Sequence, residues 1–295
     1  MKNRFLNADR ALQRKERALI KKLGITYAES LREIRHKIAD LNAKHDLTIN
    51  EMYKYNRLKT LENEVQKELT KLSNKNNINI FEHLKDTFEE SFYRTGFILE
   101  TEIQAKLRFT KLNPVQVRKA IENPLSDLAL QRSRANVIIS VNQAIAQGLI
   151  SGEGYRKISK RLNKVMEGNL NDTFRIARTE THRVQQQSRL DAFEHVSDQG
   201  VIMGKTWISS LDNRTRDTHQ ELDGQTVAMD EEFESPSGAT AEAPGQFGVA
   251  EEDINCRCSF YSVIKGFEPE FRRVKGEGVV PYTNYKEWKE ARIDE

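Results

Sequence analysis

The sequence predicts a mainly α-helical protein, in which elongated helical N-terminal and central regions precede a small α+β C-terminal domain. Three observations support this prediction. Apolar residues recur at helical spacing as far as Val196, and the stretch that follows from Val201 is β-rich and broken by turns. Charged residues make up 31% of the chain and hydrophobic residues 37%, with a mean hydropathy of -0.70, which is typical of long, solvated helices.

The chain of 295 residues is long enough for more than one core, and we expect four consecutive parts. These are a helical region over 1–111, a central helical region over 112–200, the α+β domain over 201–268 and a tail over 269–295. Lys and Arg number 23, 13 and 11 in residues 1–111, 112–200 and 201–295, against 16, 9 and 19 Asp and Glu, so the net charges are +7, +4 and −8. The basic two thirds favour a polyanionic partner, although attraction within the chain or simple solubility explains them as well.

Two apolar stripes predict the first helices, one over residues 27–41 and the other over residues 52–72. A capping box, Thr48 to Glu51, precedes the second stripe, and the two striped helices suggest an antiparallel hairpin. We expect a loop over the polar, Asn-rich residues 73–79. A further helix then resumes and ends at Gly96.

The central region contains clear helix boundaries. Asn113 followed by Pro114 predicts a helix start, because Asn caps well and Pro suits the first helical position. We expect a helix over residues 125–147 that stops at Gly148, and a turn over residues 151–154. Asn171 or Asp172 is expected to cap a last long helix that runs through Val196.

Two β-rich stretches, residues 201–211 and 258–264, are the strand candidates of the C-terminal domain. Between them we expect a short helix or turn over residues 215–222, the turn Asp223–Gly224, and a Gly/Pro/Ser-rich loop over residues 235–248. A domain of this size gains from a staple or a docking partner, because its own core is small.

Two basic clusters are candidate contacts to the phosphates of double-stranded DNA. The N-terminal cluster comprises Arg14, Lys15, Arg17, Lys21 and Lys22. The second cluster lies on one face of a short helix predicted over residues 155–165 and comprises Arg156, Lys157, Lys160, Arg161 and Lys164. Such binding is independent of base sequence, because it is made to the backbone. A solvated helix face or a subunit contact explains the second cluster equally well.

The sequence shows neither an apolar run of about 18 residues nor the continuous apolar segment of a signal peptide. We therefore expect a protein that is made and kept in a cytoplasm, with no membrane partner. Cys256 and Cys258 are one residue apart, too close in the chain to link distant elements, which argues against a disulfide framework.

An ordered series of motifs occupies the region from Ala177 to Cys258. It consists of ARTETHR at 177–183, Gly204 with Trp207, DNRTRDTHQELDG at 212–224, PGQFG at 244–248 and INCRC ending at Cys258. This series resembles the C-terminal region of the phage head morphogenesis family, the minor head proteins of tailed phages that include the F protein of phage Mu. The resemblance covers residues 125–265, and the combination of motifs is specific. Within it we expect structural roles for Arg178, Glu180, Trp207, Arg214, Arg216 and Gly224.

The resemblance implies a structural protein of the virion and not an enzyme. A minor head (capsid) protein of this family would lie inside the head near the portal vertex and act in head morphogenesis or in the fate of the packaged DNA. Its expected partners are the portal protein, scaffold or other head proteins, double-stranded DNA bound without sequence preference, and further copies of itself. Assembly would take place in the cytoplasm of the bacterial host.

Five side chains of the C-terminal domain form a candidate Zn²⁺ site, namely Asp212, His219, Asp223, Cys256 and Cys258. Two thiolates, a histidine and a carboxylate make an adequate tetrahedral set, and a metal would fasten the long loop of a small domain. The gap between the cysteines is nevertheless shorter than in a usual zinc knuckle. Two buried cysteines that behave as small hydrophobic residues, beside a capping Asp and a surface His, remain the alternative, and no cofactor is certain.

Arg214 and Arg216 also allow two interpretations. Near a helix start they suit an anion, whereas a role in holding the fold would tie them to Asp212, Asp217 or Asp223. The first interpretation leads to an enzymatic alternative, a nuclease or transferase with His219 as general acid and the two arginines as phosphate clamp. The sequence offers no partner base and no phosphate-binding Gly-rich loop, so we favour the structural protein.

Overall fold

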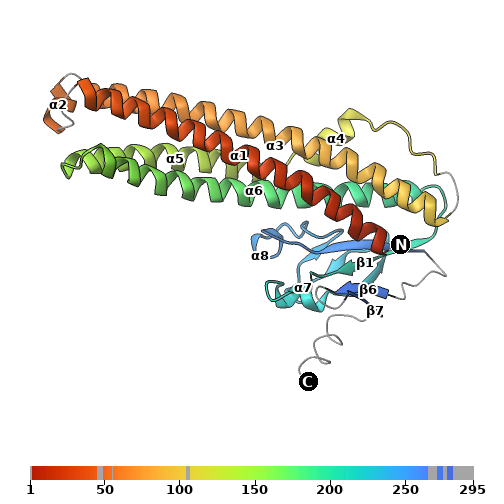
Figure 1. Cartoon of the computed structure of the whole chain (residues 1–295). Coiled ribbons are helices and arrows are strands. Elements are labelled where there is room, and N and C mark those ends of the chain that lie inside the picture. The colour runs from red at the N-terminus through yellow and green to blue at the C-terminus, as the bar shows by residue number, and fades with distance from the viewer. Residues whose placement is uncertain are drawn as a thin grey trace. The chain divides into compact units, whose positions relative to one another are not determined.

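The computed structural model of the chain describes residues 2–44, 49–54, 56–103, 107–210, 212–264, 271–274 and 278–281 (Figure 1). The helices are α1 Lys2–Lys44, α2 Ile49–Lys54, α3 Arg57–Ile103, α4 Pro114–Ile121, α5 Pro124–Ile150, α6 Tyr155–Ser197, α7 Asp217–Glu221 and α8 Ala250–Asp253. All described strands follow α6, so the expected mainly α fold with a small α+β part at its C-terminal end is confirmed. Within the described residues, none of the helices combines the length and the hydropathy needed to cross a membrane.

The chain divides into two compact units, each built from separated stretches. One unit, here called the helical unit, comprises Arg17–Glu82 and Asn123–Ala177. The other, here called the mixed unit, comprises Met1–Glu16, His83–Glu122 and Arg178–Glu295. The long helices α1, α3 and α6 contribute residues to both units. The four consecutive parts expected from the sequence stay a prediction.

In the helical unit, α1, α3, α5 and α6 run alongside one another (Figure 1) and share one hydrophobic core. Both predicted stripes contribute to it, with Ile34 from α1 and Val65 from α3 fully inaccessible to solvent. Val141 from α5 and Leu162 from α6 complete the same core. The core forms because each helix buries one apolar face and leaves its charged face in solvent.

The loop expected over residues 73–79 is wrong, because α3 continues through this Asn-rich stretch without a break. Asn76 is buried, and its side-chain oxygen accepts a hydrogen bond of 2.5 Å from the hydroxyl of Thr26 in α1. A polar residue inside a helix is tolerated when a neighbouring helix supplies its partner. The same helix also passes the expected stop at Gly96, where an added Cβ would lie 2.8 Å from the ring of Phe109.

The cap expected at Asn171 or Asp172 is also wrong, because α6 is one helix from Tyr155 to Ser197. Just before that point, the side-chain amide of Asn169 donates to Ser133 on α5, and its oxygen accepts from the Tyr27 hydroxyl on α1. Hydrogen bonds to the neighbouring helices therefore satisfy the side chain of Asn169, and α6 continues through this point.

The expected end of α5 at Gly148 is wrong by two residues, since the helix continues to Ile150. Gly148 serves a close approach instead: a Cβ there would lie 2.6 Å from Cγ1 of Ile158. The expected start at Asn113 is confirmed, because its side chain accepts a hydrogen bond of 2.9 Å from the backbone N–H of Val115. The capping residue Thr48 lies outside the described residues.

The mixed unit contains the sheet, in the order β2–β1–β5. Its strands are β1 Met203–Ile208, β2 Thr226–Ala228 and β5 Ser259–Ile264, all antiparallel, with Trp207 opposite Phe260. Both predicted strands are therefore confirmed. Two further pairs of short strands are also antiparallel. In the first, β3 Phe233–Glu234 pairs with β4 Thr240–Ala241, and in the second, β6 Phe271–Val274 pairs with β7 Gly278–Pro281.

An aromatic core ties this sheet to helices of the same unit. Phe193 on α6 meets Phe260 on β5 edge to face at 5.3 Å between ring centroids, and it meets Phe5 on α1 in the same way at 5.6 Å. Trp207 on β1 is fully buried, with its ring 5.2 Å from that of Phe233. This packing fixes the position of the loops that leave β1 and enter β5.

Candidate metal centre

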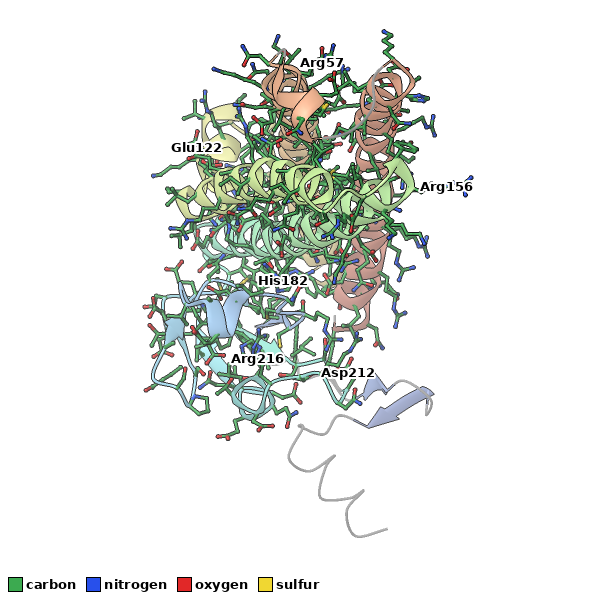
Figure 2. All side chains as sticks on the ribbon, turned by 90° about the vertical axis from the view of Figure 1, so that its left-hand side faces the viewer. Arg57, Glu122, Arg156, His182, Asp212 and Arg216 are labelled. Carbon is green, nitrogen blue, oxygen red and sulfur yellow. The ribbon has the colours of Figure 1, made fainter. Side chains whose placement is uncertain are left out.

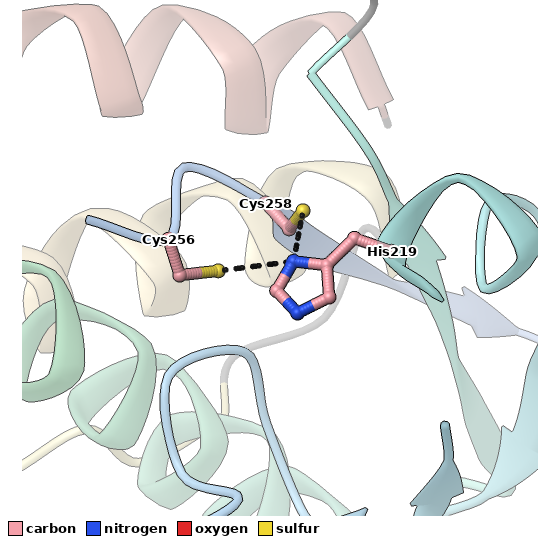
Figure 3. A group of neighbouring side chains, drawn as sticks. All are labelled: His219, Cys256 and Cys258. Atoms are coloured by element: carbon pink, nitrogen blue, oxygen red, sulfur yellow. Dashed lines mark hydrogen bonds between the residues drawn. The ribbon is translucent and has the colours of Figure 1, made fainter. Parts of the chain in front are cut away.

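Three side chains from two of these loops converge inside the mixed unit (Figure 3). His219 comes from α7, and Cys256 and Cys258 come from the segment between α8 and β5. Nδ1 of His219 lies 3.3 Å from Sγ of Cys258 and 3.7 Å from Sγ of Cys256. The candidate ligand atoms all lie within 4.8 Å of one another, and all three residues are buried. Two sulfurs and one imidazole nitrogen at this spacing match the donor types that Zn²⁺ prefers.

The end of β1 holds α7 in place. The hydroxyl of Ser209 accepts a hydrogen bond of 3.1 Å from the indole N–H of Trp207 and donates to the backbone carbonyl of His219. The same hydroxyl lies 3.9 Å from Sγ of Cys258. The indole also packs edge to face on the His219 ring, at 5.5 Å between centroids. Trp207 on β1 and Ser209 just after it thereby help to fix the position of the imidazole.

Glu252 on α8 lies on the other side of the imidazole. Its Oε2 is 2.9 Å from Nε2 of His219, and the two side chains are 4% and 1% exposed. The ring N–H is not aligned on this oxygen well enough for a regular hydrogen bond. Burial raises the pKa of Glu252, but hydrogen bonds from Ser237, Thr218 and Ser235 outweigh it and keep that pKa below its usual value.

The sequence did not single out Glu252, which is one of three successive acidic residues before the cysteines. Only its burial separates it from the exposed Glu251 beside it. Burial of this kind depends on the tertiary packing of a four-residue helix, for which the local sequence holds no signal.

The two aspartates of the expected metal set have other partners. Asp212 accepts two hydrogen bonds from the guanidinium of Arg257, at 2.6 and 2.7 Å. These bonds hold the pKa of Asp212 well below its usual range, against the opposing effect of burial. Oδ1 of Asp223 accepts from the backbone N–H of Ser209 at 2.8 Å. Among the described residues, the group that could hold a metal is therefore His219 with the two cysteines.

The two thiols influence each other strongly. A hydrogen bond with Cys258, together with burial, raises the pKa of the Cys256 thiol. The structure holds both cysteines as free thiols. Such an effect of one thiol on the pKa of the other is expected where two sulfurs share one buried space without a bond between them.

The motifs of the ordered series pack against one another in this unit. The hydroxyl of Thr179 on α6 accepts a hydrogen bond of 3.2 Å from the backbone N–H of Asn255, next to Cys256. Gly245 adopts a φ of +81°, and an added Cβ would lie 3.1 Å from the ring of His182. Only glycine fits both the conformation and the space. The ARTETHR segment of α6 therefore contacts both loops, through His182 for PGQFG and through Thr179 for NCRC.

Other residues of the series make local ties. Arg178 lies 3.5 Å from the carboxylate of Glu16, and Glu180 is buried against Arg183 at 3.0 Å. Gly224, with a φ of +86°, donates its backbone N–H to the carbonyl of Trp207 at 3.0 Å. These contacts agree with structural roles, which remain proposals for each residue.

Arg214 and Arg216 line a shallow cavity of about 460 Å³ together with Ile254 and Asn255. Arg214 lies 3.4 Å from the carboxylate of Asp212, and Arg216 donates to the backbone carbonyl of Ile254. The bidentate partner of Asp212 is Arg257, a residue that the sequence analysis did not name. Arg214 thus contacts one of the aspartates that the fold-holding interpretation named, whereas the partner of Arg216 is a backbone carbonyl and not an aspartate.

The two basic clusters lie on exposed helix surfaces. Arg156, Lys157, Lys160 and Lys164 are exposed on α6, and Figure 2 shows Arg156 extending away from the helix. Arg161 differs, because its guanidinium binds both carboxylate oxygens of Glu153, at 2.6 and 2.7 Å. On α1, the residues Arg14, Lys15, Arg17, Lys21 and Lys22 are all exposed. Lys15 lies 3.4 Å from Glu90.

Comparison with known proteins identifies relatives over most of the chain. The family described as phage Mu protein F like protein matches residues 139–261, which include every motif of the ordered series from Ala177 onward. The minor head protein GP7 of Bacillus phage SPP1 is 35% identical over 285 residues, which cover 92% of this chain and 92% of that protein. No solved structure matches the chain significantly.

A second relative carries a different name. An NAD(+)–arginine ADP-ribosyltransferase of Enterococcus faecalis is 32% identical over 210 residues, which cover 70% of this chain but 43% of that protein. More than half of that relative therefore lies outside the likeness. Because the match to GP7 spans nearly the whole of both proteins, the chain belongs to the family of phage minor head proteins that are similar to the F protein of phage Mu.

Proposed function

We propose that the protein is a minor head protein of a tailed phage that acts in head morphogenesis and is retained in the virion, inside the head near the portal. One observation carries this proposal: the 35% identity to the minor head protein GP7 extends over 92% of both chains. A likeness of that extent includes both compact units and not only the motif-bearing C-terminal part.

The proposed partners are the portal protein, scaffold or other head proteins, and further copies of this chain, met in the host cytoplasm during assembly. Exposed apolar side chains give such contacts a physical basis. Phe97 is 70% exposed, Leu125 66% and Ile150 70%, and each would lose apolar surface to water on binding a partner.

Nonspecific binding to packaged DNA is a further part of the proposal. Four lysines and arginines are exposed on the first turns of α6, and five more are exposed on α1. Cations held on a helix surface in this density bind a phosphate backbone through the release of its counterions.

A zinc ion at His219, Cys256 and Cys258 is the proposed cofactor. Its role would be structural, because the three residues are between 1% and 4% exposed and join two segments of a small, loop-rich region.

The burial of His219 also weighs against the enzymatic alternative. A nuclease or transferase centred on His219, Arg214 and Arg216 needs the imidazole to reach a phosphate that arrives from solvent. His219 is 1% exposed, and its two nitrogens face sulfur atoms on one side and Glu252 on the other. The transferase activity named for the Enterococcus faecalis relative belongs to a protein of which this chain matches 43%.

The function is tested in a phage that encodes this chain. A nonsense codon early in the gene should reduce the yield of infectious particles in a non-suppressing host, and a plasmid copy should restore it. Mass spectrometry of purified heads should detect the protein in low copy number. Normal infectivity without the protein, together with its absence from purified heads, would overturn the proposal.

A further inference from the structure

We infer that Glu252 is a positioning residue of the metal site: the negative charge of its carboxylate beside Nε2 of His219 favours the proton on that nitrogen and so leaves Nδ1 for the metal. This inference rests on the zinc ion proposed above and adds a residue that is not itself a ligand. It assigns a role to a buried carboxylate that the sequence did not distinguish from the exposed Glu251 beside it.

The two nitrogens of the imidazole face different groups. Nδ1 is directed at the sulfurs of Cys258 and Cys256, at 3.3 and 3.7 Å (Figure 3), while Nε2 lies 2.9 Å from Oε2 of Glu252. A neutral imidazole carries one proton, so only the nitrogen without it can bind a metal. A carboxylate beside Nε2 keeps the proton there and leaves the Nδ1 lone pair for the metal.

Glu252 is itself held in a fixed orientation. Its Oε2 accepts a hydrogen bond of 2.9 Å from Thr218, and its Oε1 accepts from Ser237 at 2.7 Å and Ser235 at 3.0 Å. These hydroxyls come from the residue before His219 and from the turn between β3 and β4. A carboxylate that accepts this many hydrogen bonds keeps its orientation, so its negative charge stays beside Nε2 of His219.

The same contacts connect the metal site to the loop between its ligands. His219 and Cys256 are 37 residues apart, and Ser235 and Ser237 belong to the intervening stretch. Through Glu252, a metal on Nδ1 would therefore stabilise the turn at Ser235 as well as the two ligand segments. Metal affinity and the order of this loop should change together when Glu252 is altered.

The test compares two substitutions in the full-length chain, Glu252→Gln and the matched control Glu251→Gln on the exposed face of the same short helix. Zinc is first measured by elemental analysis of protein purified without a histidine tag. Zinc affinity is then measured by competition with a chromophoric chelator. Loss of an outer carboxylate partner should weaken zinc binding by about 10- to 100-fold, and the control should bind as the wild type does.

A second measurement reads the imidazole directly and needs no variant. Long-range ¹H–¹⁵N correlation spectra of the zinc-loaded protein should show His219 protonated on Nε2 and bound to metal through Nδ1. The reverse arrangement would overturn the inference even if Glu252→Gln failed to fold. Equal zinc affinity in Glu252→Gln and wild type would also overturn it. Both results concern the role of Glu252 and leave the zinc proposal standing. The zinc proposal is overturned separately, if the wild-type protein binds no zinc when zinc alone is added.

Discussion

Asp9, near the N-terminus, accepts a hydrogen bond from the guanidinium of Arg189, although 180 residues separate the two in the chain. Arg189 is 1% exposed and also donates to the hydroxyl of Ser259 and the carbonyl of Phe260 on β5. The second oxygen of Asp9 accepts from the same Ser259 hydroxyl at 3.0 Å. The start of α1, the second half of α6 and β5 are thus joined by one buried charge pair.

Asp9→Ala should destabilise the mixed unit by about 3 kcal/mol, because it leaves the buried guanidinium of Arg189 without its counter-charge. Urea unfolding can be followed by the fluorescence of the buried Trp207, with Trp288→Phe as background to remove the second indole. Glu122→Ala is the control, since it breaks the exposed pair with Arg118 in the same unit and should cost less than about 0.5 kcal/mol. Equal costs for both variants would show that the Asp9 pair does not hold this unit.

The sequence was sufficient for features that depend on local chemistry. The apolar stripes marked the buried faces of α1 and α3, and Asn113 with Pro114 marked the start of α4. The β-rich stretches marked β1 and β5 for the same reason, since β-forming residues and the turn residues beside them are local signals. Of the candidate metal site, His219 and both cysteines were singled out from residue type alone.

The errors share a different cause, which is contact between distant segments. Asn76 and Asn169 look like loop or cap residues, yet hydrogen bonds to Thr26 and to Tyr27 and Ser133 let helices pass through them. Gly148 looks like a helix end, yet it provides space for Ile158. Glu252 could not be selected for the same reason, because its donors lie 15 to 34 residues away.

Gly148→Ala and Gly168→Ala should have opposite effects on the stability of the helical unit. The added methyl at position 148 would lie 2.6 Å from Cγ1 of Ile158, so α5 and α6 must separate, at a cost of about 1–3 kcal/mol. At position 168 on α6 nothing lies within 4 Å of the new Cβ, and the higher helix propensity of Ala should add about 0.5–1 kcal/mol. Thermal unfolding, followed by circular dichroism at the helix band, measures the change in stability of each variant. A neutral Gly148→Ala would mean that the two helices are not in close contact there.

Acid should weaken the mixed unit in part through His182. Burial lowers the pKa of His182 to about 4, with repulsion from Arg189 and His219 adding to the effect and Asp9 opposing it. The folded state therefore keeps this imidazole neutral while the unfolded chain takes up a proton below its ordinary pKa of 6.5, so stability is lost as pH falls from 6.5 toward 4. The loss in free energy of unfolding should reach about 3 kcal/mol by pH 4.

His182→Gln should flatten this part of the pH dependence, because the unfolded chain then gains no proton at position 182. Urea unfolding at a series of pH values gives the free energy of unfolding of each protein. Subtracting the values of the variant from those of wild type removes the contribution of the carboxylates, which both proteins share. His36→Gln, an exposed histidine on α1, is the control and should leave the profile unchanged. A profile for His182→Gln that is as steep as that of wild type would contradict the assignment.

DNA binding should be nonspecific and should depend steeply on salt, and the exposed cations at the start of α6 should supply part of that dependence. Each phosphate contact contributes about 0.9 to the slope of log affinity against log salt concentration. The triple reversal of Arg156, Lys157 and Lys160 to Glu should lower that slope by about 2–3. Arg161 is left unchanged, because its guanidinium is occupied by Glu153.

Fluorescence anisotropy with a labelled duplex, repeated over a range of salt concentrations, measures the slope for the full-length chain. The control reverses Lys59, Lys67 and Lys71, three exposed residues of α3 that change the net charge by the same amount. A loss confined to the α6 variant assigns the contact to that helix face. If both variants lose the same amount, only net charge matters and the cluster is no binding surface. If the α6 variant keeps its full slope, the phosphate contacts lie elsewhere, and the exposed cations of α1 between Arg14 and Lys22 become the next residues to reverse.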